Sequence, residues 1–266
     1  MKFASLKKIL TAGLIGLTCL AATAHAEDLL DQVKARGTLR IGLEGTFPPF
    51  NSKDPKTGDL VGFDVDIAKA VAAKLGVKPE FITTEWSGII AGLQAGKFDV
   101  IVNQVGATDA RKQVLDFSPG YTFSGAELIQ RKDDTRQFAS LEDLKGKKLG
   151  VGLGTNYMDM AKSVPGIDVK TYPGAPEYLR DLAAGRLDAA LNDKLMLAYL
   201  MKTSDLPLKR GAMVGTANPS AIPFKKGNPK FAKAIDDAMT QLEADGTFTK
   251  ISEKWFGIDV TKPAAK

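Results

Sequence analysis

The most informative charged residue lies in the segment VNQVGATDARKQVLDFS, residues 102–118. Thr108 follows an apolar run and has the residue type and position of a helix N-cap. Arg111 then falls in the first turn of the predicted helix, where the helix dipole disfavours a cation. Two interpretations follow. The guanidinium binds an anion through two parallel hydrogen bonds, or it forms a salt bridge with Asp109, Asp116 or a more distant acid.

A glycine-rich turn, GVGLGTNY at residues 150–157, joins a predicted strand to a predicted helix. A dinucleotide-binding fingerprint would need glycine where Thr155 stands, and no P-loop lysine follows, so the pattern argues against a nucleotide. Close backbone approach at Gly154, with the N–H and hydroxyl of Thr155 as donors, suits a small anion. An ordinary strand-to-helix turn is the alternative, and the segment alone favours it.

A carboxylate and three aromatic residues complete the set of candidates. Asp193 ends the apolar strand LDAALND, where it needs a cationic partner or caps the following helix. Phe47, Phe50 and Trp86 follow predicted strands, and they either flank a ligand or pack in the core. An anion clamp at Arg111, a carboxylate for a cation and an apolar wall together match an α-amino acid zwitterion.

Strand and helix patterns alternate along the chain, which predicts an α/β fold with mostly parallel strands. Two patterns also recur in order: TLRIGLEGT at 38–46 resembles KLGVGLGT at 148–155, and LQAGKFDVIVNQ, ending at Gln104, resembles LAAGRLDAALND, ending at Asp193. We therefore expect two similar lobes. Because ligands bind beside the carboxyl ends of such strands, Gln104 and Asp193 should face each other across a cleft.

The first 26 residues have a different composition from the rest. Three lysines precede an apolar stretch, and Ala24-His25-Ala26 forms a small-x-small cleavage pattern. This pattern predicts a cleaved secretory signal peptide over residues 1–26. No other stretch reaches the roughly 18 apolar residues of a membrane helix, so we expect an exported, soluble mature protein.

Composition narrows the chemistry of the mature chain. The only cysteine, Cys19, and the only histidine, His25, lie in the predicted signal peptide. Ser-His-Asp and Cys-His nucleophile systems, thiolate or imidazole metal sites and disulfides are therefore excluded. Any remaining chemistry uses carboxylates, hydroxyls, lysine, arginine and the backbone. As a separate expectation, we predict no catalytic residue, no metal and no cofactor. Loss of Lys2, Lys7 and Lys8 lowers the formal net charge from +5 to +2, so no nucleic acid partner is expected.

With these motifs in place, the sequence resembles the periplasmic polar amino acid-binding proteins of ABC importers, solute-binding protein family 3. The resemblance covers about residues 37–257 and rests on motifs such as GTLRIGLEGTFPPF, LVGFDVDIAKAVAAKLG, GRLDAALND and DGTFTKISEKWFG. It implies a type II periplasmic binding protein with two hinge strands, in which residues 27–122 and 218–266 form lobe 1 and residues 123–217 form lobe 2.

The resemblance also implies roles for individual residues. Arg111 and Thr155 would hold the ligand carboxylate, and Asp193 would hold the α-ammonium. Gly106 departs from the family pattern, because many members have serine or threonine there. The implied ligand-binding residues are Glu44, Phe47, Phe50, Trp86, Gln104, Val105, Gly106, Arg111, Gly154, Thr155 and Asp193.

Within the family, GLEGTFPPF, VNQV and GVGLGTNY are most similar to cystine-binding members. We therefore expect a monomer that captures L-cystine, or L-cysteine, and delivers it to an ABC transporter permease. Another polar amino acid such as glutamine is an alternative ligand. An enzyme of the dehydratase type on the same scaffold, with Glu44 or Asp193 as general acid, is an alternative function. A third class of function is the sensor domain of a membrane receptor, but the transmembrane helix expected of such a receptor is not found in this sequence.

Overall fold

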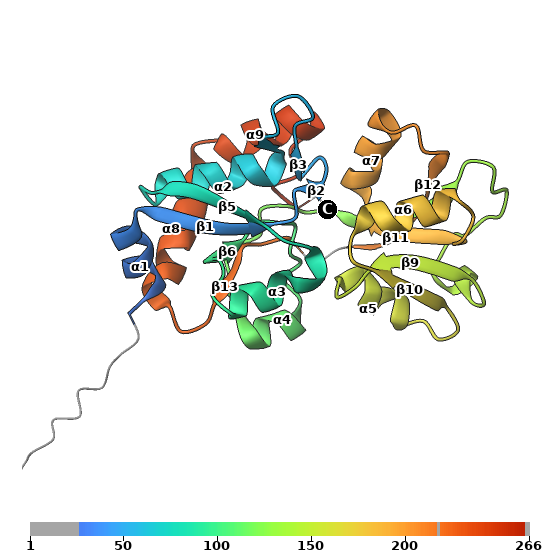
Figure 1. Ribbon diagram of the computed structural model, residues 1–266, viewed down its shortest axis with the longest axis horizontal. Coiled ribbons are helices and arrows are strands. Elements are labelled where there is room, and N and C mark those ends of the chain that lie inside the picture. Colours follow the sequence, from blue (N-terminus) through green and yellow to red (C-terminus); the bar gives the residue numbers. More distant parts are fainter. Residues whose placement is uncertain (1–26, 217–218, 264–266) are drawn as a thin grey trace, which may run out of the picture.

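The computed structural model describes residues 27–216 and 219–263. The predicted signal peptide, residues 1–26, lies outside the described residues. Two α/β lobes lie side by side, each built on one five-stranded sheet (Figure 1). We use lobe 1 for the part around the first sheet and lobe 2 for the part around the second.

The two sheets have the same architecture, with strand orders β5-β1-β6-β13-β7 and β10-β9-β11-β8-β12. The second strand in each order pairs in parallel with both neighbours, and the fourth runs antiparallel to both of its neighbours. Four of the five strands in each sheet therefore run in one direction, which confirms the predicted repeat and the mostly parallel α/β fold. The strands of the first sheet are β1 (Thr38–Leu43), β5 (Lys78–Thr83), β6 (Val100–Ile101), β7 (Leu115–Phe117) and β13 (Pro223–Lys225). Those of the second are β8 (Gly125–Arg131), β9 (Lys148–Gly152), β10 (Asp168–Tyr172), β11 (Ala189–Asp193) and β12 (Leu208–Thr216).

Helices cover both faces of each sheet (Figure 1). The central strands are therefore buried on both sides, which is why they read as apolar runs; all five residues of β11 are buried. The helices of lobe 1 are α1 (Leu29–Arg36), α2 (Phe63–Lys74), α3 (Trp86–Gln94), α4 (Asp109–Val114), α8 (Pro229–Ala244) and α9 (Thr247–Phe256). Those of lobe 2 are η1 (Glu142–Leu144, a 3₁₀ turn), α5 (Asn156–Lys162), α6 (Ala175–Ala183) and α7 (Lys194–Thr203). None of the helices in the described ranges combines the length and apolar character needed to cross a bilayer.

A small antiparallel sheet beside lobe 1 brings the chain to the start of α2. Its strands are β2 (Thr46–Phe47), β3 (Asn51–Lys53) and β4 (Leu60–Val61). Gly62 follows with φ of 141°, and a Cβ there would lie 2.1 Å from the carbonyl oxygen of Phe50. Only glycine fits this close approach, so Gly62 sets where α2 begins.

The chain crosses between the lobes twice, from β7 to β8 and from β12 back to β13. The two crossings pair with each other: the Ser220 N–H donates to the Thr122 carbonyl at 2.9 Å, and the Tyr121 N–H donates to the Ser220 carbonyl at 2.8 Å. The crossings therefore form a short two-stranded connection beside the space between the lobes.

Candidate functional site

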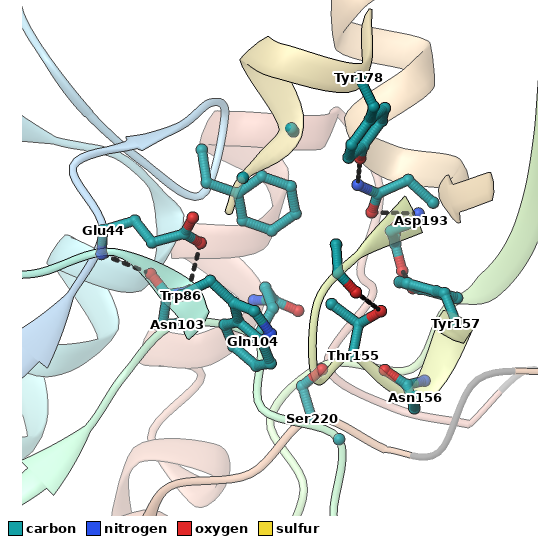
Figure 2. A pocket seen from close by; sticks show the side chains of 16 residues that line it. Glu44, Trp86, Asn103, Gln104, Thr155, Asn156, Tyr157, Tyr178, Asp193 and Ser220 are labelled. Carbon is teal, nitrogen blue, oxygen red and sulfur yellow. Dashed lines mark hydrogen bonds between the residues drawn. The ribbon is translucent and has the colours of Figure 1, made fainter. Parts of the chain in front are cut away.

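A pocket of about 630 Å³, including its opening to solvent, lies between the lobes (Figure 2). Lobe 1 contributes Glu44, Phe47, Trp86, Asn103, Gln104, Gly106 and Ser220. Lobe 2 contributes Gly152, Thr155, Asn156, Tyr157, Gly174, Ala175, Tyr178, Asn192 and Asp193.

Asp193 forms the acidic part of the lobe 2 wall. It is 6% exposed, and its carboxylate accepts hydrogen bonds from the Ser124 hydroxyl at 2.7 Å and the Tyr157 hydroxyl at 3.2 Å. It also caps α7 by accepting from the Leu195 N–H at 2.7 Å. Burial raises the pKa of Asp193, and these three hydrogen bonds oppose that rise. Asp193 is thus both a helix cap and a pocket residue, so the two interpretations of its sequence position are compatible.

Arg111 lies next to the pocket without being part of its lining. Its guanidinium donates to the carbonyls of Gly106 and Gly154, each at 2.9 Å, and lies 5.4 Å from the centre of the Trp86 ring. Because Gly154 belongs to lobe 2, this side chain connects the lobes. A guanidinium has five N–H donors, so donors remain for an anion. Burial lowers the pKa of Arg111, with Asp159 opposing the effect.

Within the described part of the chain, Arg111 does not form the alternative salt bridge to Asp109, Asp116 or another acid. Asp109 instead lies 3.8 Å from Lys112, and over residues 27–216 and 219–263 no carboxylate pairs with the Arg111 guanidinium. Thr108 caps α4, as its position predicts, by accepting from the Arg111 backbone N–H at 3.3 Å.

Thr155 lines the pocket, but its donors are engaged within its own turn. Its hydroxyl donates to the Gly152 carbonyl at 2.8 Å and accepts from the Met158 N–H at 3.1 Å, which makes it the N-cap of α5. The Thr155 N–H also points to the Gly152 carbonyl, at 3.3 Å. Residues 150–157 therefore form the strand-to-helix turn given as the alternative. Gly154 contacts the Arg111 guanidinium through its carbonyl.

The predicted aromatic residues divide into two groups. Phe47 and Trp86 line the pocket, whereas Phe50 is fully buried and packs against Phe47 and Phe256 at ring-centre distances of 5.0 and 5.8 Å. Phe50 is therefore not part of the pocket lining, and it packs behind Phe47 in the core. Val105 is likewise buried, in an apolar cluster of lobe 1 that includes Trp86.

Glu44 and Gln104 form the polar part of the lobe 1 wall. The Asn103 amide donates to the Glu44 carboxyl group at 2.8 Å, and Figure 2 shows this contact at the edge of the pocket. Burial raises the pKa of Glu44 to about 7; the bond from Asn103 opposes the rise, and nearby carboxylates, first Asp64, add to it. Gln104 has φ of 53°, a left-handed conformation that is uncommon outside glycine.

The pocket also contains polar residues that the sequence reasoning missed. Tyr178 and Asn192 are bonded to each other, and Ser220 lies beside Gly106 through a β-bridge. Asn103 directly precedes Gln104, and Asn192 directly precedes Asp193. Their position at the carboxyl ends of strands was the one feature of the sequence that could have predicted Asn103 and Asn192 as pocket residues.

Comparison with characterised sequences gives a consistent result. Residues 39–258 match the family described as bacterial extracellular solute-binding proteins, family 3. The L-cystine-binding protein TcyJ of Escherichia coli strain K12 is 40% identical over 267 residues, covering 98% of this chain and 100% of TcyJ. The L-cystine-binding protein TcyA of Bacillus subtilis strain 168 is 38% identical over 236 residues, covering 88% and 87% of the two chains.

Solved structures show the same two-lobed fold. An ancestral arginine-binding protein bound to arginine is 42% identical with a TM-score of 0.79, covering 84% of this chain and 99% of that one. The ancestral amino acid-binding protein AncCDT-1, a precursor of cyclohexadienyl dehydratase, is 36% identical with a TM-score of 0.78, covering 85% and 99%. From the match over most of its length, the chain belongs to the bacterial extracellular solute-binding proteins, family 3.

Proposed function

We propose that this protein captures an amino acid, specifically L-cystine, in the pocket between its lobes and delivers it to an ABC transporter permease. The observation that carries the proposal is the charge arrangement around one pocket. The buried carboxylate of Asp193 lies on lobe 2, and the guanidinium of Arg111 lies on lobe 1 against two lining residues, Gly106 and Trp86. A zwitterion can engage both groups at once, with its ammonium at Asp193 and its carboxylate at Arg111.

Two further features support L-cystine. The similarity to TcyJ and TcyA favours this ligand over other amino acids. L-Cystine also carries two ammonium groups, and the pocket has a second acidic side chain, Glu44, on the opposite wall from Asp193 (Figure 2). Ser220, beside Gly106, supplies a hydroxyl group near the position where many family members carry one.

Closure of the two lobes would couple binding to transport. A ligand held by residues of both lobes stabilises the closed arrangement in proportion to its differential affinity for that state. The permease then receives the closed, loaded form. We place the protein in the periplasm as a monomer, after removal of residues 1–26; size-exclusion chromatography with light scattering and cell fractionation test both points.

Isothermal titration calorimetry tests the function on protein that has been unfolded and then refolded to remove any bound ligand. We expect binding of L-cystine, and loss of binding in Arg111→Ala, Asp193→Ala and the isosteric Asp193→Asn. Lys112→Ala and Asp109→Ala, which change exposed charges beside Arg111, serve as controls with unchanged affinity. Undiminished affinity in the Arg111 or Asp193 variants would reject the site. Glu44→Gln should weaken the binding of L-cystine more than the binding of L-glutamine, because L-glutamine has only one ammonium group.

A second candidate is a dehydratase acting on a cyclohexadienyl acid. The similarity to AncCDT-1 and the raised pKa of Glu44, about 7, favour it, because a carboxyl group protonated near neutral pH can act as general acid. The binding role has more support, since TcyJ and TcyA are both binding proteins. Turnover of prephenate by purified protein, lost in Glu44→Gln, would establish the enzyme instead.

A further inference from the structure

A buried carboxylate in lobe 1 lies behind the pocket and is not part of its lining. Asp64, in the first turn of α2, is fully buried. It accepts hydrogen bonds from three side chains: Gln104 Nε2 at 2.7 Å, Tyr121 OH at 3.0 Å and Asn51 Nδ2 at 3.1 Å. An ionised carboxylate only accepts hydrogen bonds, so it suits three donors, and the start of α2 favours its negative charge.

One branch of this network leads to the hinge. The Tyr121 hydroxyl donates to Asp64 and accepts from the Gln104 backbone N–H at 3.2 Å. Gln104 Nε2, already bonded to Asp64, also lies 3.2 Å from the Thr122 hydroxyl. Tyr121 and Thr122 belong to the first crossing between the lobes and pair with Ser220 of the second. Asp64 thus holds Gln104 in its left-handed conformation and ties it to both crossings.

The other branch leads to Glu44 in the pocket wall. Asn51 Nδ2 donates to Asn103 Oδ1 at 2.8 Å, and Asn103 Nδ2 donates to Glu44. The amide orientations are set by the backbone, because the Gly45 N–H donates to Asn51 Oδ1 and the Glu44 N–H donates to Asn103 Oδ1, both at 2.8 Å. A backbone N–H cannot accept, so both Nδ2 groups must face away from it. The Asp64 oxygen that faces Asn51 must therefore be an acceptor.

We propose that Asp64 is a positioning residue, which fixes Glu44 and Gln104 on the pocket wall and couples both to the hinge crossings. The inference rests on the proposed amino acid-binding function. Asp64→Asn has nearly the same shape but only one accepting oxygen. If that oxygen serves Gln104 and Tyr121, the new amide N–H₂ opposes Asn51, which cannot reverse without losing its bonds to Gly45 and Asn103.

Asp99 provides a matched control, because it lies at the opposite end of β6 from Asn103 and Gln104. It immediately precedes β6, is 2% exposed, and is bonded to Arg36 and Arg40. Asn103 and Gln104 follow β6 at its carboxyl end. Asp99→Asn therefore also removes a buried charge from lobe 1, but away from the pocket and the hinge.

Calorimetry with L-cystine and peptide-level hydrogen exchange by mass spectrometry test the inference. We expect both variants to lower the thermal midpoint, and only Asp64→Asn to weaken affinity, by at least about tenfold. In the ligand-free protein, Asp64→Asn should accelerate exchange in residues 103–107 and 119–123, and Asp99→Asn should not. If Asp64→Asn does not fold, Tyr121→Phe, which removes one hydroxyl group from the network, is measured in its place and should give the same pattern with a smaller loss.

Coupling to Glu44 separates positioning from general destabilisation. Because Asp64 acts through Glu44, the affinity loss of Asp64→Asn with Glu44→Gln should be smaller than the product of the single losses, whereas the losses for Asp99→Asn with Glu44→Gln should multiply. Affinity within twofold of wild type and unchanged exchange in Asp64→Asn would overturn the inference, as would equal effects in Asp99→Asn. Failure of the proposed function has a different result: the wild-type protein then binds no amino acid. In that case the hydrogen-exchange comparison by itself tests whether Asp64 positions the pocket wall and the crossings.

Discussion

Replacing Glu44 by glutamine should change how the stability of the ligand-free protein depends on pH. Burial raises the pKa of Glu44 from 4.5 to about 7 in the folded protein. The folded state therefore keeps this proton at pH values where the unfolded chain has lost it. Ionisation of Glu44 thus destabilises the folded state, and stability falls as the pH rises through the window from about 4.5 to about 7.

The size of the effect follows from the same pKa values. A tenfold change in proton affinity corresponds to about 1.4 kcal/mol, so complete ionisation of Glu44 costs the folded state on the order of 3 kcal/mol. Part of this cost is already present at pH 5, and the linkage relation gives a loss on the order of 2 kcal/mol between pH 5 and pH 8. Glu44→Gln cannot ionise, while its side-chain oxygen can still accept from Asn103.

Urea unfolding followed by the fluorescence of Trp86 and Trp255 measures this difference. Both proteins are refolded from denaturant to remove any ligand, and each is unfolded at pH 5 and at pH 8. Asp64, whose pKa burial raises to about 6, adds a fall in stability over the same interval in both proteins. The variant should therefore be more stable relative to wild type at pH 8 than at pH 5, by an amount on the order of 2 kcal/mol.

An exposed glutamate provides the control. Glu243 is exposed on α8, so Glu243→Gln removes a carboxyl group that lies in water rather than in the pocket wall, and it serves as the matched variant. A wild-type and Glu44→Gln pair with parallel stability curves from pH 5 to pH 8 would refute the reasoning, because burial would then not disfavour the ionised form of Glu44.

Three further substitutions test the local structure around the site. Gly62→Ala should lower the free energy of unfolding by about 3 kcal/mol or more, because its Cβ would lie 2.1 Å from the Phe50 carbonyl; thermal melting checks this. Thr155→Val removes the cap of α5 and should cost about 1 kcal/mol in urea unfolding; an unchanged midpoint would contradict the cap. Ser124→Ala removes a donor 2.7 Å from the buried Asp193 carboxylate and should cost about 1–3 kcal/mol at pH 7. Its crystal structure should show Asp193 unmoved, and a rotated Asp193 would argue against this arrangement.

The sequence predicted the structure best where the relevant pattern extends over only a few neighbouring residues. Alternating strand and helix patterns and the two recurring segments predicted two similar α/β lobes, and the identical strand orders confirm this prediction. The positions of Gln104 and Asp193 also followed, because residues at the carboxyl ends of equivalent strands meet the same cleft.

Side-chain partners were decided only by the tertiary structure. Phe50 reads like Phe47 in the sequence, yet its side chain packs in the core. Arg111 was recognisable as an unusual cation, but its contact with the Gly154 carbonyl joins residues 43 positions apart.

The same limit applies to the buried network behind the pocket. Asp64 stands in an amphipathic helix pattern, and its bonds to Gln104 and Tyr121 span 40 and 57 positions. The sequence alone determined the elements and the strand ends, because hydrophobic periodicity and turn residues act over a few positions. Which polar groups meet inside the protein depends on how distant segments pack and on every buried donor finding an acceptor, and only the complete fold brings those segments together.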